Sequence, residues 1–249
     1  MNDFLNALFI FINNPEVHDL NYQIALGLLE NGHELDYLTI SELAEKCYVS
    51  TSSLNRFFRI FGYKKYMIFK ALFASHMRVR FVQIQNRITE KKPEQLNKIL
   101  SASLKEDDYQ TIMKRDWVEK ACKIIHDSKR IVVIGSDEMF GHFSRVQVDF
   151  YVMGKLMVKD SIYQTNFIKP HKDDCVILLS MAGRIVDLNP WLIDQLKENT
   201  SQMITLGHHA YVEEALPLRI PDYLDEVLEN MLLDYYMQEI TYYYVENYL

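Results

Sequence analysis

Side chains that can recognise DNA are concentrated in the segment 50–65, which reads STSSLNRFFRIFGYKK. Arginine can donate two hydrogen bonds to guanine O6 and N7, and asparagine can pair with adenine in a similar way. Lysine and hydroxyl side chains commonly bind phosphate oxygens, which positions a protein but carries no sequence preference. As base-reading residues we predict Ser52, Ser53, Asn55 and Arg56. As phosphate-binding residues we predict Thr51, Arg59, Lys64 and Lys65.

Two short amphipathic helices are predicted to position these side chains. Thr39 followed by Glu42 is the capping-box pattern that starts a helix. The apolar residues of this first helix are Ile40, Leu43, Ala44 and Cys47. After a short interruption, Ser50 can cap a second helix and Gly62 can end it. The apolar stripe of the second helix consists of Leu54, Phe57, Phe58 and Phe61, so its polar residues should face solvent.

An ordinary pair of packed helices with a solvated outer face would show the same pattern. The distribution of charge favours the DNA-binding interpretation. The chain has a net charge of -7, yet residues 39–100 hold twelve Lys or Arg against four Asp or Glu. Residues 1–38, in contrast, hold six acidic residues and no Lys or Arg. Because attraction to phosphate is screened within about 10 Å, a local basic region can bind DNA on an acidic protein.

After Trp117 the chain changes to short β-rich segments that alternate with helical ones. The predicted strands are 130–134, 155–159, 175–180, 202–206 and a stretch near residue 217. Such alternation is typical of a mainly parallel sheet flanked by helices. The helical stripes predicted to cover this sheet are Met139, Phe143, Val146 and Phe150, and then Leu188, Trp191, Leu192 and Leu196. The predicted fold is therefore multidomain, with an all-α bundle followed by an α/β domain.

Two loops that follow predicted strands have the composition of an anion-binding site, GSDEMF after the first strand and SMAGRI after the third. Glycine lets backbone amides approach an anion, and a following helix N-terminus favours negative charge. Ligands of parallel α/β folds bind beyond the carboxyl ends of the strands. The predicted ligand-binding residues are Gly135, Ser136, Ser180, Gly183 and Arg184. The alternative is that these glycines and serines only form strand-to-helix turns.

The N-terminal segment resembles the DNA-binding domain of the RpiR family of phosphosugar-responsive transcription regulators. The resemblance rests on TISELAEKCYVS at 39–50, on Arg56-Phe57, and on Phe61-Gly62-Tyr63 followed by lysines. It implies a helix-turn-helix bundle over residues 1–76 that binds operator DNA as a dimer. In this family a sugar isomerase (SIS) domain follows and senses a phosphorylated sugar. The second half resembles such a domain over 115–249, which leaves 77–114 as a helical linker.

The ligand loops depart from the usual SIS pattern, so the predicted domain is a degenerate one. In the first loop, Asp137 and Met139 stand where the family has glycine and serine. In the second, Ala182 and Ile185 replace hydroxyl residues, while Ser180 and Gly183 remain. Three alternatives stay open for this domain: a weaker or altered phosphosugar ligand, a different ligand without an anionic group, or a fold retained for dimerisation only.

The resemblance implies a regulator of sugar or amino-sugar metabolism genes, with double-stranded operator DNA as its partner. It also implies a phosphorylated sugar effector and a homodimer or higher homo-oligomer. We predict that the chain is not an enzyme. The alternative is a phosphosugar isomerase, for which Glu138, His142 and His208 are the candidate proton-transfer groups. A tyrosine-rich helix after Asp222 fits either a dimer interface or packing within the chain.

The composition, 49% hydrophobic and 24% charged residues, is typical of a globular protein rather than a disordered or fibrous one. No apolar run approaches the roughly 18 residues of a membrane span, and the apolar start lacks the basic residues of a secretory signal. The three scattered cysteines, Cys47, Cys122 and Cys175, are expected to be reduced. We therefore expect a cytoplasmic protein that has no membrane partner, metal site or cofactor.

Overall fold

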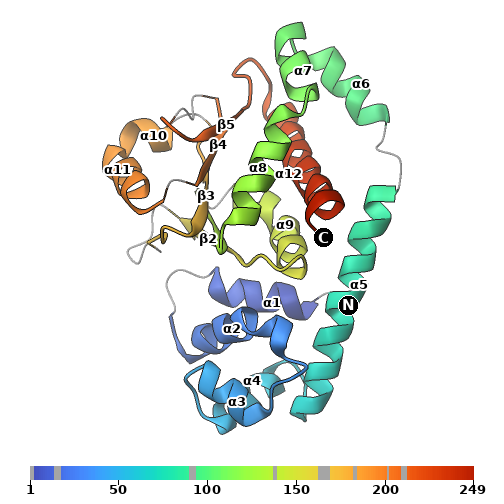
Figure 1. Cartoon of the computed structure of the whole chain (residues 1–249), viewed down its shortest axis with the longest axis vertical. Coiled ribbons are helices and arrows are strands. Elements are labelled where there is room, and N and C mark those ends of the chain that lie inside the picture. Colours follow the sequence, from blue (N-terminus) through green and yellow to red (C-terminus); the bar gives the residue numbers. More distant parts are fainter. Residues whose placement is uncertain are drawn as a thin grey trace. The chain divides into compact units, whose positions relative to one another are not determined.

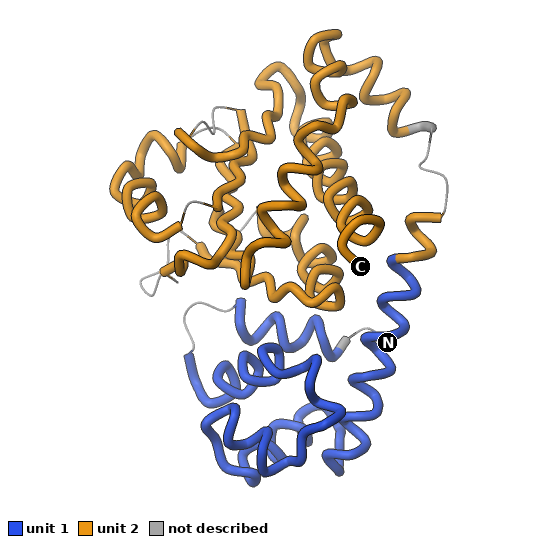
Figure 2. The backbone as a smooth tube through the Cα atoms, in the orientation of Figure 1, with its two compact units in different colours: residues 1–84 blue, residues 85–249 orange. Residues whose placement is uncertain are grey.

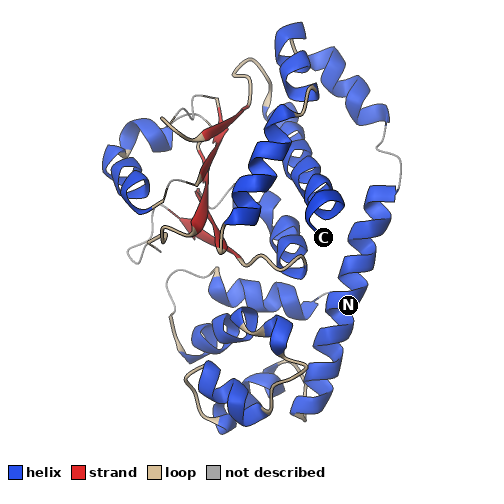
Figure 3. Ribbon diagram, viewed as in Figure 1, coloured by secondary structure: helices blue, strands red, loops and turns tan. Residues whose placement is uncertain are grey.

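The computed structural model describes residues 3–13, 18–89, 94–136, 139–161, 169–181, 184–200, 202–208 and 212–249. The chain forms two compact units, residues 1–84 and residues 85–249 (Figure 2). The first unit is helical, whereas the second contains a sheet flanked by helices (Figure 3). This arrangement confirms the predicted fold class. Within the described parts of the chain, no helix is long and apolar enough to cross a bilayer.

In its described residues, the first unit is built from helices. They are α1 (Asp3–Ile12), α2 (Leu20–Glu30), the 3-10 helix η1 (Gly32–Glu34), α3 (Ile40–Lys46), α4 (Thr51–Ile60) and most of α5 (Tyr66–Thr89). Aromatic rings fill their shared core. The ring of Phe58 stacks on Phe69 at a centroid distance of 4.3 Å, and Phe4 meets Phe69 edge-on at 4.9 Å. Full burial of one such side chain stabilises a fold by about 1.5–3 kcal/mol, so these rings hold α1, α4 and α5 together.

Helix α5 continues without interruption past residue 76, the predicted end of the first domain. The compact units divide between residues 84 and 85, inside this helix. The rest of the predicted 77–114 linker contains two further helices. These are α6 (Glu94–Ser103) and α7 (Glu106–Met113).

The second unit is built on a five-stranded sheet that is parallel throughout. Its strands are β1 (Arg130–Gly135), β2 (Met157–Ser161), β3 (Asp174–Leu179), β4 (Met203–Gly207) and β5 (Leu216–Arg219), in the order β2-β1-β3-β4-β5. All five strands were predicted from the sequence within two residues. Because the chain leaves β1 toward β2 on one side and later places β3 on the other, the carboxyl ends of β1 and β3 form the topological switch point.

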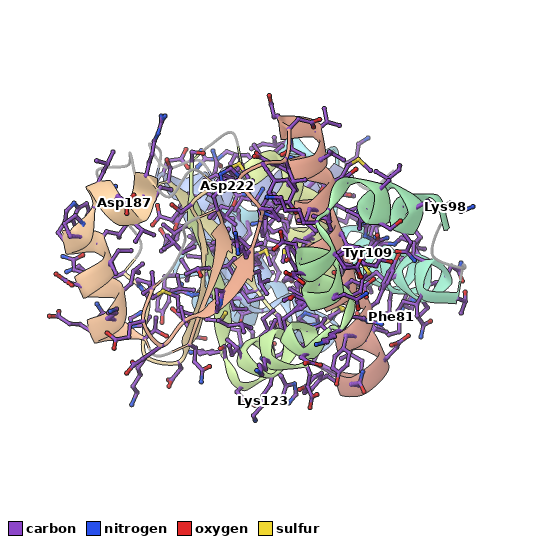
Figure 4. All side chains as sticks on the ribbon, turned by 90° about the horizontal axis from the view of Figure 1, so that it is seen from above. Phe81, Lys98, Tyr109, Lys123, Asp187 and Asp222 are labelled. Atoms are coloured by element: carbon purple, nitrogen blue, oxygen red, sulfur yellow. The ribbon has the colours of Figure 1, made fainter. Side chains whose placement is uncertain are left out.

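Helices cover both faces of this sheet (Figure 1). They are α8 (Asp116–Asp127), α9 (Phe140–Val152) and α12 (Glu226–Tyr248) on one face, and α10 (Arg184–Leu188) and α11 (Pro190–Asn199) on the other. Figure 4 shows the same layers from above, with Asp187 on α10 and Tyr109 on α7 on opposite sides of the sheet. Three of the four residues of the predicted α9 stripe, Phe143, Val146 and Phe150, are buried, whereas Met139 precedes the helix and is half-buried.

The second predicted stripe was half wrong. Leu192 and Leu196 are buried as expected, but Leu188 is 73% exposed and Trp191 is 52% exposed. The sequence interpretation assumed one continuous helix through these four positions. In the structure Asn189 separates α10 from α11, and Pro190 begins the second helix. This break separates Leu188 from α11, whereas Trp191 lies on α11 itself but off its buried face.

The tyrosine-rich α12 packs within its own chain, against α8 and α9. Tyr235, Tyr242 and Tyr244 are buried, as is Tyr236. The core-packing alternative is therefore confirmed for these rings.

Two buried carboxylates are neutralised by arginines from distant positions. Asp149 on α9 pairs with Arg87 of α5 at 2.8 Å, and Glu239 on α12 pairs with Arg115 at 2.8 Å. Both carboxylates are 1% exposed. Loss of either arginine would take an ion-pair partner from a buried carboxylate, which is unfavourable.

Candidate functional site

Helix α4 begins and ends as its sequence dictates. The Ser50 hydroxyl caps it by accepting a hydrogen bond from the Ser53 amide at 3.1 Å. The preceding helix α3 begins with the predicted capping box, in which Thr39 and Glu42 bond each other's backbone amides. Gly62, at φ +81, follows the end of α4 and adopts a backbone conformation that side chains disfavour.

One side of α4 is anchored in the core of the first unit and the other is open. Leu54, Phe57 and Phe58 are each exposed by 1% or less. The predicted DNA-binding residues of α4 lie on the remaining surface: Thr51, Ser52, Arg56 and Arg59 are exposed, and Ser53 and Asn55 are half-buried. Lys64 and Lys65, which follow the helix, are also exposed. The structure thus brings all eight residues together along one helix and the turn after it.

The cations of this surface have no partner in the part of the chain that the structure describes. Among the described residues, no hydrogen bond or ion pair occupies the side chains of Arg56, Arg59, Lys64 or Lys65. Exposed guanidinium and ammonium groups without a protein partner remain available for phosphate oxygens or base edges. We call this surface, residues 51–53, 55, 56, 59, 64 and 65, the α4 face.

The serines of the α4 face also stabilise the helix start. Ser50 Oγ lies 2.8 Å from Ser52 Oγ and 2.9 Å from Ser53 Oγ. A hydroxyl offers one donor and two acceptor sites, so a single contact leaves further capacity. Ser52 and Ser53 can therefore contribute to the helix cap and still meet an external partner.

The predicted ligand loops begin on adjacent strands. Gly135 pairs with Ser161 of β2, and its Cα faces Leu179 of β3 so closely that a Cβ would lie 3.0 Å from that side chain. Ser136 follows it and is half-buried. Across the switch point, Ser180 follows β3 and Arg184 begins α10 with an exposed side chain. The predicted residues Gly183, Asp137 and Glu138 lie outside the described residues.

Ser180 already has a structural contact. Its side chain is 2% exposed, and its hydroxyl accepts a hydrogen bond from the Ile185 amide at 3.2 Å. Its carbonyl group packs against Gly207, where a Cβ would lie only 2.0 Å from the carbonyl oxygen. The hydroxyl of Ser180 therefore helps to start α10, and its proton and one acceptor site are left for a ligand.

The carboxyl end of β2 carries three buried polar residues that sequence reasoning missed. Lys159, Asp160 and Ser161 are exposed by 6%, 0% and 1%. The ammonium of Lys159 donates to the carbonyl of Phe140 at 2.7 Å and to the Ser144 hydroxyl at 2.9 Å, both on α9. The only signal in the sequence was a polar triplet at the end of an otherwise apolar strand. Removal of the ammonium from water lowers the pKa of Lys159 to about 8.

This depressed pKa predicts a pH-dependent contribution to stability. The unfolded chain releases this proton near pH 10.4, roughly, so between about pH 8 and 10 it binds more protons than the folded chain. The contribution of Lys159 should therefore become more favourable as the pH rises, by up to about 1.4 kcal/mol per pH unit. In urea unfolding, we expect the free energy of unfolding of the wild type, minus that of Lys159→Met, to increase as the pH rises.

The comparison with the variant is essential because buried thiols act in the opposite direction. Burial raises the pKa of Cys47 to about 11 and that of Cys122 to about 12 in both proteins. Their effect cancels in the difference between wild type and variant. A difference that stays constant from pH 7 to 10, roughly, would show that Lys159 keeps an ordinary pKa.

Two candidate histidines each lie beside a carboxylate of α12. His142 Nδ1 is 3.3 Å from Asp234 Oδ1, and His208 Nε2 is 2.7 Å from Glu229 Oε1. His142 lines a cavity of about 560 Å³ between α9 and α12. Within the described part of the chain, no three His, Cys, Asp or Glu side chains are placed to hold a metal ion.

Comparisons with known proteins give likenesses only among solved structures. No protein-family model matches the chain. No curated protein matches it either.

Among solved structures, the chain is similar to the Vibrio vulnificus NanR protein complexed with ManNAc-6P. That likeness has a TM-score of 0.44 and 16% identity, over 98% of this chain and 92% of that chain. It is also similar to a hypothetical protein of Methanococcus jannaschii, whose structure infers a molecular function of 3-hexulose-6-phosphate isomerase. That likeness has a TM-score of 0.41 and 17% identity, over 66% of this chain and 87% of that chain.

Proposed function

We propose that this chain is a transcription regulator that binds double-stranded DNA through α4. In this proposal α3, the turn after it and α4 form a helix-turn-helix, and α4 enters the major groove as the recognition helix. Asn55 and Arg56, with Ser52 and Ser53, meet base edges. Thr51, Arg59, Lys64 and Lys65 bind flanking phosphates.

The α4 face is the observation that carries the proposal. Its arginines, Arg56 and Arg59, are exposed and unengaged among the described residues, while Phe57 and Phe58 hold the helix from behind. Basic side chains clustered on one face are the electrostatic signature of a nucleic-acid-binding surface. The surrounding block of positive net charge adds long-range attraction to phosphates.

We further propose that the second unit is a degenerate SIS domain that senses a phosphorylated sugar. The support is its parallel sheet, with Ser136 and Arg184 near the two strand ends that form the switch point. In this proposal the chain acts as a cytoplasmic homodimer on genes of sugar or amino-sugar metabolism. Effector binding alters DNA affinity by favouring one arrangement of the two DNA-binding units.

A phosphosugar isomerase is the alternative in the enzyme class. Its support is limited to two histidines, His142 and His208, each of which lies beside a carboxylate. One pair of variants distinguishes a regulator from an isomerase. Turnover of a phosphosugar that survives Arg56→Ala and disappears with Ser180→Ala would favour the enzyme over the regulator.

The salt dependence of DNA binding tests the assignment of Lys65. Each phosphate contact releases condensed counterions, so the slope of log K against log salt falls by about 0.9 per contact. We expect Lys65→Ala to weaken binding to all duplexes about equally and to make this slope less negative by about 1. Fluorescence anisotropy over a series of salt concentrations measures both quantities. An unchanged slope would remove Lys65 from the DNA contacts, and failure of the wild type to bind any duplex at low salt would defeat the proposed function.

A further inference from the structure

The turn between α3 and α4 contains a residue in an unfavourable backbone conformation. Tyr48 has φ +56, which places it in the left-handed region. For a residue with a side chain this conformation costs about 1–2 kcal/mol relative to the right-handed region, and glycine avoids that cost. A feature of the surrounding backbone must therefore hold Tyr48 there.

The end of α3 explains the backbone of Tyr48. The Tyr48 amide donates to the Glu45 carbonyl at 3.0 Å, and the Val49 amide donates to the Ala44 carbonyl at 2.9 Å. This pair of hydrogen bonds is the Schellman motif, which ends a helix with one left-handed residue, usually glycine. Tyrosine thus occupies a position whose backbone favours glycine.

Residues of helix α2 hold the backbone of this turn in place. The side-chain amide of Gln23 donates to the carbonyls of Cys47 and Tyr48 at 3.1 and 3.2 Å. Gly27 lies so close to Cys47 that a Cβ on Gly27 would be 2.6 Å from the thiol sulfur. The backbone of the turn is therefore clamped to α2, and the Tyr48 side chain can point only outward.

The Tyr48 side chain does not contribute to the core, since it is 87% exposed. The described residues make no ring contact with it and no hydrogen bond to its hydroxyl. Its position is nevertheless specific, because Ser50 caps α4 only two residues later. The exposed phenol thus stands beside the start of the α4 face, in a turn whose geometry is fixed.

From this geometry we propose that Tyr48 is a DNA-backbone contact, whose hydroxyl donates a hydrogen bond to a phosphate oxygen flanking the groove that α4 enters. The inference rests on the proposed function of the α4 face and extends it to a residue outside α4. Tyrosine hydroxyls are common phosphate donors in protein–DNA complexes. The clamped turn favours binding because little backbone freedom is left to lose. Gln23 acts as a positioning residue for this contact.

Two variants separate the hydroxyl from the backbone. Tyr48→Phe removes only the hydroxyl, so the Kd for a mixed-sequence duplex at low salt should rise about tenfold or more, the equivalent of one hydrogen bond to a charged group. The melting temperature should not change. Tyr48→Gly relieves the backbone, so it should raise the melting temperature and still weaken DNA binding at least as much as Tyr48→Phe. If Tyr48 had only a structural role, a variant with a higher melting temperature would not bind DNA more weakly.

Tyr243→Phe is the matched control, because it removes a hydroxyl from a half-buried tyrosine of the second unit. We expect it to leave the Kd unchanged. An unchanged Kd in Tyr48→Phe overturns the inference, whatever Tyr48→Gly does, as does an equal loss in the control. If the wild type binds no duplex, the proposed function fails. If the wild type binds and Tyr48→Phe binds equally well, only this inference fails.

Discussion

Replacement of Arg56 by alanine is expected to weaken binding of the preferred duplex roughly 5- to 150-fold, which corresponds to a loss of about 1–3 kcal/mol. The reason is that, in the proposed complex, the variant would lose a bidentate contact with a guanine. Because Arg56 is exposed and its side chain is unengaged among the described residues, the free energy of unfolding should stay within about 0.5 kcal/mol of the wild type.

The matched control for this variant is Arg145→Ala, which removes an exposed arginine of the second unit. It should bind DNA like the wild type. Competition with unrelated duplexes separates base reading from general attraction. If Arg56 reads a base, the variant should lose most of the difference between preferred and unrelated duplexes. An equal loss on every duplex would reduce Arg56 to a phosphate contact.

Truncation of Phe58 is the prediction with the largest effect on stability. The ring is 1% exposed and stacks on Phe69 at 4.3 Å and on Tyr66 at 5.9 Å. Phe58→Ala should destabilise the first unit by about 3–5 kcal/mol, because it removes buried apolar surface and leaves a cavity. Urea unfolding followed by circular dichroism measures this loss. DNA binding should fall with it, since α4 loses its anchor.

Ile60→Ala serves as the control within the same helix. Ile60 is 58% exposed, so its truncation should change the free energy of unfolding by less than about 0.5 kcal/mol. A similar loss in both variants would mean that burial in the aromatic core is not what holds α4. A loss below about 1 kcal/mol in Phe58→Ala would contradict the packing described for α4.

Local patterns were sufficient to predict α3, α4 and the five strands. The capping box at Thr39 and the phenylalanine spacing in α4 are set by residues within one or two turns of each other, so periodicity reveals them. The exposure of the α4 face follows from the same periodicity. Alternating composition was likewise enough to place each strand of the parallel sheet.

The features missed from the sequence depend on distant partners or on backbone geometry. Asp149 lies in an apolar stretch of α9, and only the fold brings Arg87 beside it. Lys159 is buried because α9 supplies a carbonyl and a hydroxyl for its ammonium. The left-handed backbone of Tyr48 arises from hydrogen bonds at the end of α3, at a position where composition would suggest glycine. None of these features produces a periodic pattern in the sequence.

The most direct test of the central claim is selection of duplexes from a random pool by the full-length chain, with wild type and Arg56→Ala in parallel. We expect the wild type to enrich a defined motif at low salt and Arg56→Ala to lose the preference for guanine at one position of that motif. A wild-type pool that stays random, or a motif that survives intact in the variant, would contradict the claim that the α4 face reads DNA.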